Sequence, residues 1–239
     1  MTRHLVALFL GAAIFTSCST RVEPIAQTYS DVKIAGAMRN VMWKSELEGV
    51  IQIDTIREKK GLYALGPLSF LRGEIMINDG EAYVSRVTSD TTMWVEKTFD
   101  VSAPFLVYAT INEWTELDLP DSIKTIKELE FFVDLKTQSA KRPFALKLTG
   151  KIASAKIHVQ NLAPGAKVSS PQEAHSGQVK FALENEEVAI VGFFSTEHQG
   201  VFTHHDTYLH LHLITSDEAE MGHLDAVEFG KMKLYLPKS

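Results

Sequence analysis

The 239-residue sequence has very little cysteine, no excess of basic residues and no apolar run long enough to span a membrane. Its single cysteine, Cys18, excludes a disulfide within the chain and leaves histidine and carboxylate side chains as the metal ligands to consider. Lys and Arg total 24 against 30 Asp and Glu, and the net charge of −6 argues against a nucleic-acid-binding surface or a polybasic membrane patch. The nine histidines are the unusual feature of this composition.

The first seventeen residues have the pattern of an export signal. Arg3 lies in a short basic start, residues 5–15 form an apolar run, and two small residues precede Cys18. Because this arrangement resembles a bacterial lipobox, we expect a lipidated Cys18 and an envelope protein held at the membrane through its lipid anchor alone. A plain secretory signal with an incidental cysteine is the alternative. The expected organisation is a signal peptide at 1–17, a tether at 18–30 and one domain at 31–239.

Hydrophobic spacing predicts an α+β fold that is strand-rich, with mixed β-sheets and about three helices. An Asn-Asp-Gly turn at residues 78–80 predicts a β-hairpin within residues 73–87. The expected helices cover residues 34–47, 122–132 after a capping Asp121, and 172–185 after Pro171. The other expected strands cover residues 144–160 with an interruption at Gly150, 188–194 and 208–215.

Three histidines near the C-terminus have the spacing of a metal site. His210 and His212 lie two apart in a β-rich run, so a strand places both side chains on one face, about 7 Å apart. His223 follows eleven residues later, after a polar turn and a glycine that allows close backbone approach. Three neutral imidazoles with an open fourth position describe a catalytic zinc site better than a closed structural one. The same spacing also fits ordinary histidines on an alternating strand.

The run His204-His205-Asp206 complicates this assignment. These residues could supply metal ligands themselves, orient the three histidines through hydrogen bonds, or be solvated. We rank the orienting and solvated interpretations first.

Several blocks between about residues 61 and 229 form a recognisable series. The run YLHLHLITSDEAEMGHLDAV is similar to the Tyr-His-x-His, polar turn and Gly-Gly-His with a following Leu-Asp of the α-acetolactate decarboxylase family, although Tyr208 is displaced by one residue and one glycine is lost. GPLSFLRGEIMINDGEAYV resembles the family's Gly-Glu strand and Asp-Gly hairpin. FALKLTGKI resembles the family's Phe-x-Ala-x-x-x-x-Gly segment, and VAIVGFFSTEHQGV resembles the run that precedes the metal strand. The order and spacing of these blocks are more specific than any one of them.

The resemblance implies a fold of mixed sheets, a zinc site and the conversion of 2-acetolactate, a small 2-hydroxy-3-oxo acid, to acetoin and CO₂. It assigns Zn²⁺ to His210, His212 and His223. Loss of a carboxylate beside a ketone builds negative charge on the ketone oxygen, which a metal ion stabilises as a Lewis acid. Glu74, which aligns with the family's Gly-Glu, is the residue expected to transfer the proton.

Two departures from the family pattern affect the expected activity. The family has an arginine that can grip the substrate carboxylate, and counting from Gly150 places His158 at that position. Lys156 and Arg142 do not lie in register with it. Family members also bring a glutamate to the metal from a C-terminal extension, whereas sixteen residues follow His223 here. No spacing supports Glu220 or Glu228 as its replacement.

These departures keep three hypotheses open. The first is an exported zinc decarboxylase acting on acetolactate, and the second is a metal enzyme in which His158 selects another substrate. The third is an envelope lipoprotein that keeps the fold and binds a metal without catalysis. The sequence leaves a homodimer open as well.

Overall fold

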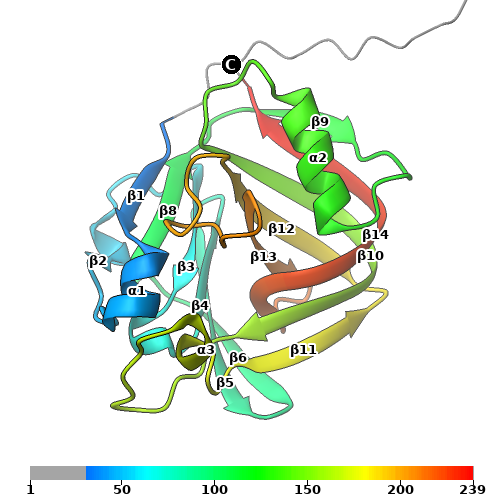
Figure 1. The fold of residues 1–239 in the computed structure, drawn as a ribbon. Coiled ribbons are helices and arrows are strands. Elements are labelled where there is room, and N and C mark those ends of the chain that lie inside the picture. The colour runs from blue at the N-terminus through cyan, green and yellow to red at the C-terminus, as the bar shows by residue number, and fades with distance from the viewer. Residues whose placement is uncertain (1–30, 239) are drawn as a thin grey trace, which may run out of the picture.

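The structure is a computed structural model that describes residues 31–238 (Figure 1). The expected signal, lipidated Cys18 and tether lie outside this range. Two six-stranded sheets and one two-stranded sheet make up most of the described chain, with three α-helices. The expected strand-rich α+β class with about three helices is confirmed, and the neighbouring strands of residues 31–238 pair antiparallel. None of the described helices is both long enough and apolar enough to cross a membrane.

Each large sheet contains six strands, which follow in their spatial order. The first sheet consists of β1 (Lys33–Gly36), β8 (Phe105–Thr110), β3 (Leu62–Pro67), β4 (Glu74–Asn78), β5 (Glu81–Ser89) and β6 (Thr92–Lys97). The second consists of β11 (Val179–Glu184), β10 (Phe144–Val159), β12 (Glu187–Phe194), β13 (Leu209–Thr215), β14 (Met221–Pro237) and β9 (Trp114–Asp118). The small sheet pairs β2 (Ile51–Gln52) with β7 (Ser102–Ala103), and two 3₁₀ turns cover Ile53–Thr55 and Ser69–Leu71.

The second sheet closes on itself. β10 pairs with both β12 and β14, so β10, β12, β13 and β14 form a closed barrel. Register shifts beginning between Gly150 and Ile152 bend the long β10 strand, as bulges do. Leucines of β13 and the apolar face of α2 (Ile126–Lys136) share one buried core with this barrel, and a second core lies between the barrel and the first sheet. The three histidines expected to bind metal, His210, His212 and His223, lie on the side of the barrel that faces this second core.

The expected hairpin is confirmed. β4 and β5 pair along the whole hairpin, from Asn78 opposite Glu81 next to the turn to Glu74 opposite Ser85 at the open end. Asp79 and Gly80 in the turn have φ angles of 52° and 84°, the positive values that a tight two-residue hairpin turn requires. The hairpin therefore places Glu74 at the start of a central strand of the first sheet.

The three expected helices form with different bounds. The first begins only at Met38 (α1, Met38–Lys44), because Gly36 has a φ of 66° and the residues before it form β1. The second begins at Ile126, since Thr125 and Glu128 form a capping box that replaces the expected Asp121 cap.

The third helix is a single turn, α3 (Pro171–Ala174), and the segment predicted to continue it forms β11 instead. Gly177 has a φ of 82°, which ends the helical path and turns the chain into the strand. The strand expected at residues 144–160 runs through Gly150 as β10, so the glycine marks a bulge rather than an interruption.

Candidate metal centre

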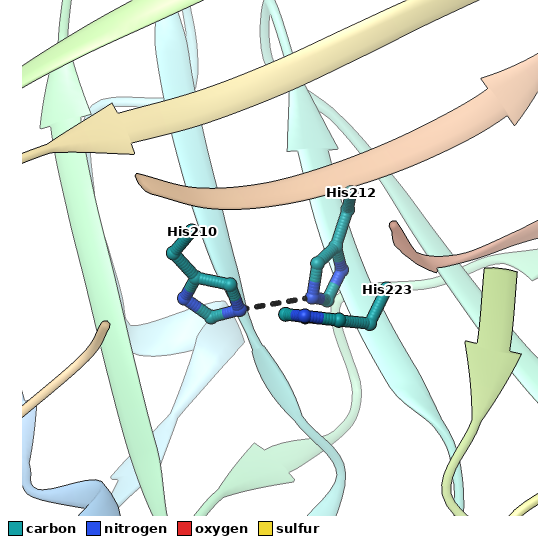
Figure 2. Close-up of side chains that lie close together, drawn as sticks. All are labelled: His210, His212 and His223. Carbon is teal, nitrogen blue, oxygen red and sulfur yellow. Dashed lines mark hydrogen bonds between the residues drawn. The ribbon is translucent and has the colours of Figure 1, made fainter. Parts of the chain in front are cut away.

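The three histidines expected to bind metal converge, and we call His210, His212 and His223 the metal triad (Figure 2). His210 and His212 come from β13, while His223 comes from β14 and pairs directly opposite His212. The leucines that alternate with the β13 histidines point into the barrel core, so both imidazoles point toward the first sheet. One ligand atom from each member lies within 4.8 Å of those of the other two, close enough to share one ion.

Burial keeps the metal triad neutral. His210, His212 and His223 are 2%, 0% and 9% exposed. Desolvation, followed by repulsion from neighbouring histidines, holds the pKa of His210 and of His223 well below the usual range, and desolvation lowers the pKa of His212 to about 3. Neutral imidazoles have the free lone pair that metal binding requires.

The nitrogen geometry fits a small divalent ion. His210 Nε2 and His212 Nε2 lie 3.2 Å apart, close to the roughly 3.3 Å that separates two tetrahedral ligands with metal–nitrogen bonds of about 2.0–2.1 Å. These two Nε2 atoms lie within hydrogen-bond distance of each other, and the Nδ1 atom of His210 is buried without a hydrogen-bond partner among the described residues. Three neutral nitrogen donors are the protein ligand set of a zinc site of the catalytic type.

Glu74 lies next to the metal triad from the opposite sheet. Its Oε2 atom is 3.7 Å from His212 Nε2, and its Oε1 atom accepts a hydrogen bond of 3.2 Å from the backbone N–H of Gln160. The side chain is 3% exposed, and this burial raises its pKa well above the usual range, outweighing the opposing hydrogen bond. Because His212 has a lowered pKa and Glu74 a raised one, the contact joins two neutral groups. A protonated carboxyl group at this position can donate a proton.

Three more histidines surround the metal triad, and we call His158, His175 and His204 the outer histidines. The ring centres of His158 and His204 lie 4.7 Å and 5.2 Å from that of His223. His175, directly after α3, lies 6.4 Å from His158 and 6.3 Å from His204 by the same measure. Spacing along the chain gave no signal for His175, because only the folded topology brings β10, α3 and the loop before β13 together.

His158 lies opposite His223 in the β10–β14 pairing. Its Nδ1 atom is 2.7 Å from Oδ1 of Asp225, the aspartate of the Leu-Asp pair that follows His223 in the sequence. Lys156 is exposed and pairs with Ala226, two residues away from His158 along β10. The position that the family resemblance assigns to arginine is therefore occupied by a histidine–aspartate pair.

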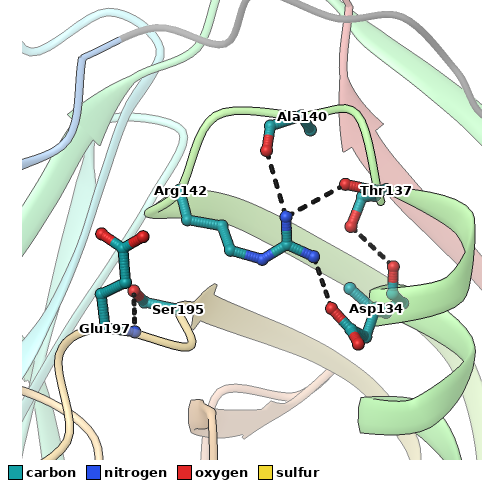
Figure 3. Close-up of polar contacts among 7 residues, drawn as sticks. Asp134, Thr137, Ala140, Arg142, Ser195 and Glu197 are labelled. Atoms are coloured by element: carbon teal, nitrogen blue, oxygen red, sulfur yellow. Dashed lines mark hydrogen bonds and ion pairs between the residues drawn. The ribbon is translucent and has the colours of Figure 1, made fainter.

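Arg142 has a structural role at the end of α2. It donates hydrogen bonds to the backbone oxygens of Thr137 and Ala140, at 3.2 Å and 3.1 Å, and pairs with Asp134 (Figure 3). These contacts satisfy carbonyl groups at the end of α2, where a positive charge is favourable. The guanidinium is thus engaged away from the metal triad.

The other residues considered from the sequence lie at the edge of the site or outside it. His205 and Asp206 are exposed, whereas His204 is partly buried and has a pKa lowered chiefly by burial. Glu220 lies in the turn between β13 and β14, and Glu228 is exposed opposite Ser154. Neither glutamate belongs to the group of described residues that could hold one ion.

The fold and the site together define a class: a strand-rich protein whose antiparallel barrel and facing sheet enclose a buried three-histidine cluster beside a carboxyl group of raised pKa. The chain belongs to the α-acetolactate decarboxylase family, whose family model, described as alpha-acetolactate decarboxylase, matches residues 36–238. This family consists of carboxy-lyases, and membership agrees with the resemblance seen in the sequence.

Individual relatives agree with the assignment. The chain is 25% identical over 218 residues to an alpha-acetolactate decarboxylase of Methanosarcina mazei, covering 90% of this chain and 72% of the relative. It is 28% identical over 179 residues to the enzyme of Lactococcus lactis subsp. cremoris, covering 74% and 71%. Acetolactate decarboxylase from Bacillus subtilis subspecies spizizenii shares the fold, with a TM-score of 0.71, 19% identity and coverage of 89% and 87%.

Proposed function

We propose that this protein is a zinc-dependent decarboxylase that converts 2-acetolactate to acetoin and CO₂. The observation that carries this proposal is the buried metal triad with the Glu74 carboxyl group 3.7 Å from one of its imidazoles. Membership of a carboxy-lyase family supports the reaction class. The neutral nitrogen donors and their close spacing support a divalent metal such as zinc.

Decarboxylation breaks the bond between the carboxylate carbon and C2, and its electron pair passes into the neighbouring ketone. When bound, the metal ion supplies Lewis-acid stabilisation for the negative charge on the ketone oxygen. The carbon that lost CO₂ must then gain a proton, and Glu74 is the donor, because burial raises its pKa and favours the protonated form. The Gln160 N–H holds the carboxyl group in place, and water returns the proton after each cycle.

His158 contacts the substrate carboxylate in this proposal. Since Nδ1 is held by Asp225, the ring can offer the substrate no more than one donor, at Nε2. An arginine would offer two parallel donors to the same carboxylate. Substrate binding is therefore weaker here than with an arginine.

Acetoin formation from racemic acetolactate tests the proposal. At matched metal occupancy we expect Glu74→Gln to lower kcat by about 100- to 10,000-fold, the range for loss of a general acid. Glu220→Gln is the matched control, because Glu220 also has a pKa raised by burial but lies outside the metal triad, so its activity should equal that of the wild type. Chelation of the metal should abolish turnover and readdition should restore it.

The outcomes separate the parts of this proposal. Equal activity in the wild type and Glu74→Gln would reject only the proton-transfer role. Metal binding without acetoin formation would favour the second candidate, a metal-binding envelope protein with another substrate or no catalysis. The pairing of Asp225 with His158 favours this candidate, since it adds a negative charge next to the site expected for the substrate carboxylate.

We also propose that the mature protein begins at a lipidated Cys18 and is anchored in the cell envelope. The apolar run and the small residues before the only cysteine support this processing. Mass spectrometry of envelope material should find a lipid-modified N-terminal Cys18. Soluble exported protein with an unmodified Cys18 would leave export in place and reject the anchor.

A further inference from the structure

The metal triad is almost inaccessible from solvent. Its three imidazoles are 0–9% exposed, so an ion that binds after folding needs a passage to them. A cavity of about 510 Å³ reaches one member of the triad, His223, which forms part of its wall, while His210 and His212 lie behind it. The volume is sufficient for a hydrated divalent ion, because one water occupies about 30 Å³ in the liquid.

The strand pairing explains where the cavity lies. β13 and β14 pair at only three positions, from Ile214–Met221 to His212–His223. Beyond His223, β14 pairs with β10 instead, so the two strands separate on the side of the metal triad. Leu211 of β13 and Leu224 of β14 line the cavity on either side of the separation, and Ile126 of α2 lines it as well.

The polar groups on the wall suit a cation. Asp206, Asp225 and Glu130 supply three carboxylates against the single ammonium group of Lys127, and the ring of His204 lies 5.2 Å from that of His223. Such a lining raises the local concentration of cations and the rate of their association. Imidazole and carboxylate groups are also the ligand types that divalent transition metals accept.

We propose that this cavity is the route by which the divalent metal ion enters, and that His204 and Asp206 bind the ion transiently before it reaches the metal triad. The inference rests on the metal centre of the proposed function. His204 and Asp206 speed both capture and release, so they change the rate of loading without changing the final affinity.

The rate of Co²⁺ uptake tests the route, since Co²⁺ reports nitrogen coordination by its visible absorption and needs no substrate. Chelator-treated protein is mixed with Co²⁺ in a stopped-flow instrument, and affinity is measured separately by competition with a chelator. We expect the second-order uptake constant to fall about 10-fold in His204→Ala and about 3-fold in Asp206→Asn, with affinity changed less than about twofold. His205→Ala is the matched control, because the neighbouring His205 is exposed.

A second variant tests the route without touching a polar group. Ile126→Trp should narrow the cavity from α2 and slow uptake and release together. Raising the ionic strength should slow wild-type uptake more than that of Asp206→Asn, since salt screens an attractive charge. These experiments need only folded protein that binds the metal.

Two results would overturn the route. In the first, His204→Ala, Asp206→Asn and Ile126→Trp all take up Co²⁺ as fast as His205→Ala. In the second, the Co²⁺ affinity of His204→Ala falls by the same factor as its uptake rate, which would make His204 a permanent ligand. Failure of the wild type to take up any Co²⁺ or Zn²⁺ would instead reject the metal centre and the proposed function with it. Normal metal uptake without acetoin formation would reject the decarboxylase activity and leave the route standing.

Discussion

The metal triad and the outer histidines contain the same residue type in neighbouring places, yet their arrangements differ. The triad comes from two adjacent strands whose register is set by the His212–His223 pair, and its ligand atoms lie within 4.8 Å of one another. The outer histidines come from a third strand, the end of a short helix and a loop, and His175 lies more than 6 Å from each of the other two by ring centres. The register between two paired strands can make nitrogen atoms converge on one point. Three independently placed elements bring their rings near one another, but the nitrogen atoms do not converge.

The two groups also differ in their charged partners. The triad is buried next to a carboxyl group that its own burial keeps protonated, so neutral ligands face a neutral neighbour. In the outer group, His158 pairs with Asp225, whose side chain is 30% exposed. This difference suits the triad to holding a metal ion and the outer histidines to handling charged species that approach it.

Removal of the triad should have the largest effect. The double variant His210→Ala/His212→Ala loses two of three ligands and should bind Zn²⁺ more than about 100-fold more weakly, since changes even to residues that only support metal ligands lower affinity 10- to 100-fold. The matched double variant His175→Ala/His204→Ala should lose less than about 10-fold. Equilibrium titration against a competing chelator measures both. Stoichiometric zinc in the first variant would move the metal site to the outer histidines.

The convergence of the triad could be predicted because its information is local: a two-residue spacing in a strand followed by a short turn constrains three side chains. The spacing left ordinary histidines open, so the assignment of the triad to a metal and of Glu74 to proton transfer came from the resemblance to the family. The outer group depends on contacts far apart in the chain: Asp225 reaches His158 across 67 residues. Helix bounds were mispredicted where a glycine with positive φ, Gly36 or Gly177, stops an apolar pattern that would otherwise continue.

The second prediction concerns how the stability of the metal-free protein depends on pH, which distinguishes the buried histidines of the triad from exposed ones. His212 has a pKa of about 3 in the folded protein against about 6.5 in the unfolded chain. Above pH 6.5 it is neutral in both states. As the pH falls below 6.5, only the unfolded chain takes up the proton, so the metal-free protein loses stability until the pH reaches about 3. Between pH 7 and pH 5 this loss is about 2 kcal/mol for His212, and His210 and His223 act in the same direction.

Glu74 opposes this trend. Its raised pKa means that the folded protein keeps a proton that the unfolded chain releases above about pH 4.3, so its contribution to stability is lost as the pH rises. Urea unfolding of chelator-treated protein at pH 7, 6 and 5 should therefore show a steeper acid loss in Glu74→Gln and a shallower one in His212→Asn. His205→Asn, at an exposed position, should match the wild type. An unchanged pH dependence in His212→Asn would mean that His212 is not buried in its neutral form.

The smallest expected effect comes from the outer group. His158→Arg should raise kcat/KM for acetolactate about 10-fold, because a hydrogen bond to a charged group contributes roughly 1.5 to 3 kcal/mol and 1.4 kcal/mol is tenfold. Asp225, 2.7 Å from the His158 ring, can accept one edge of the guanidinium and leave the other edge for the substrate carboxylate.

The control for this gain places the same charge elsewhere in the outer group. His175→Arg adds an arginine at a ring whose centre is 6.4 Å from that of His158, and should leave kcat/KM nearly unchanged. Acetoin formation at matched zinc occupancy measures both variants. An equal gain in the two would show that only the added positive charge matters, since attraction from a distance does not require a particular position. No gain in His158→Arg, with its metal affinity intact, would show that His158 does not stand where the substrate carboxylate binds, and the Asp225–His158 pair would then have to act on another part of the substrate.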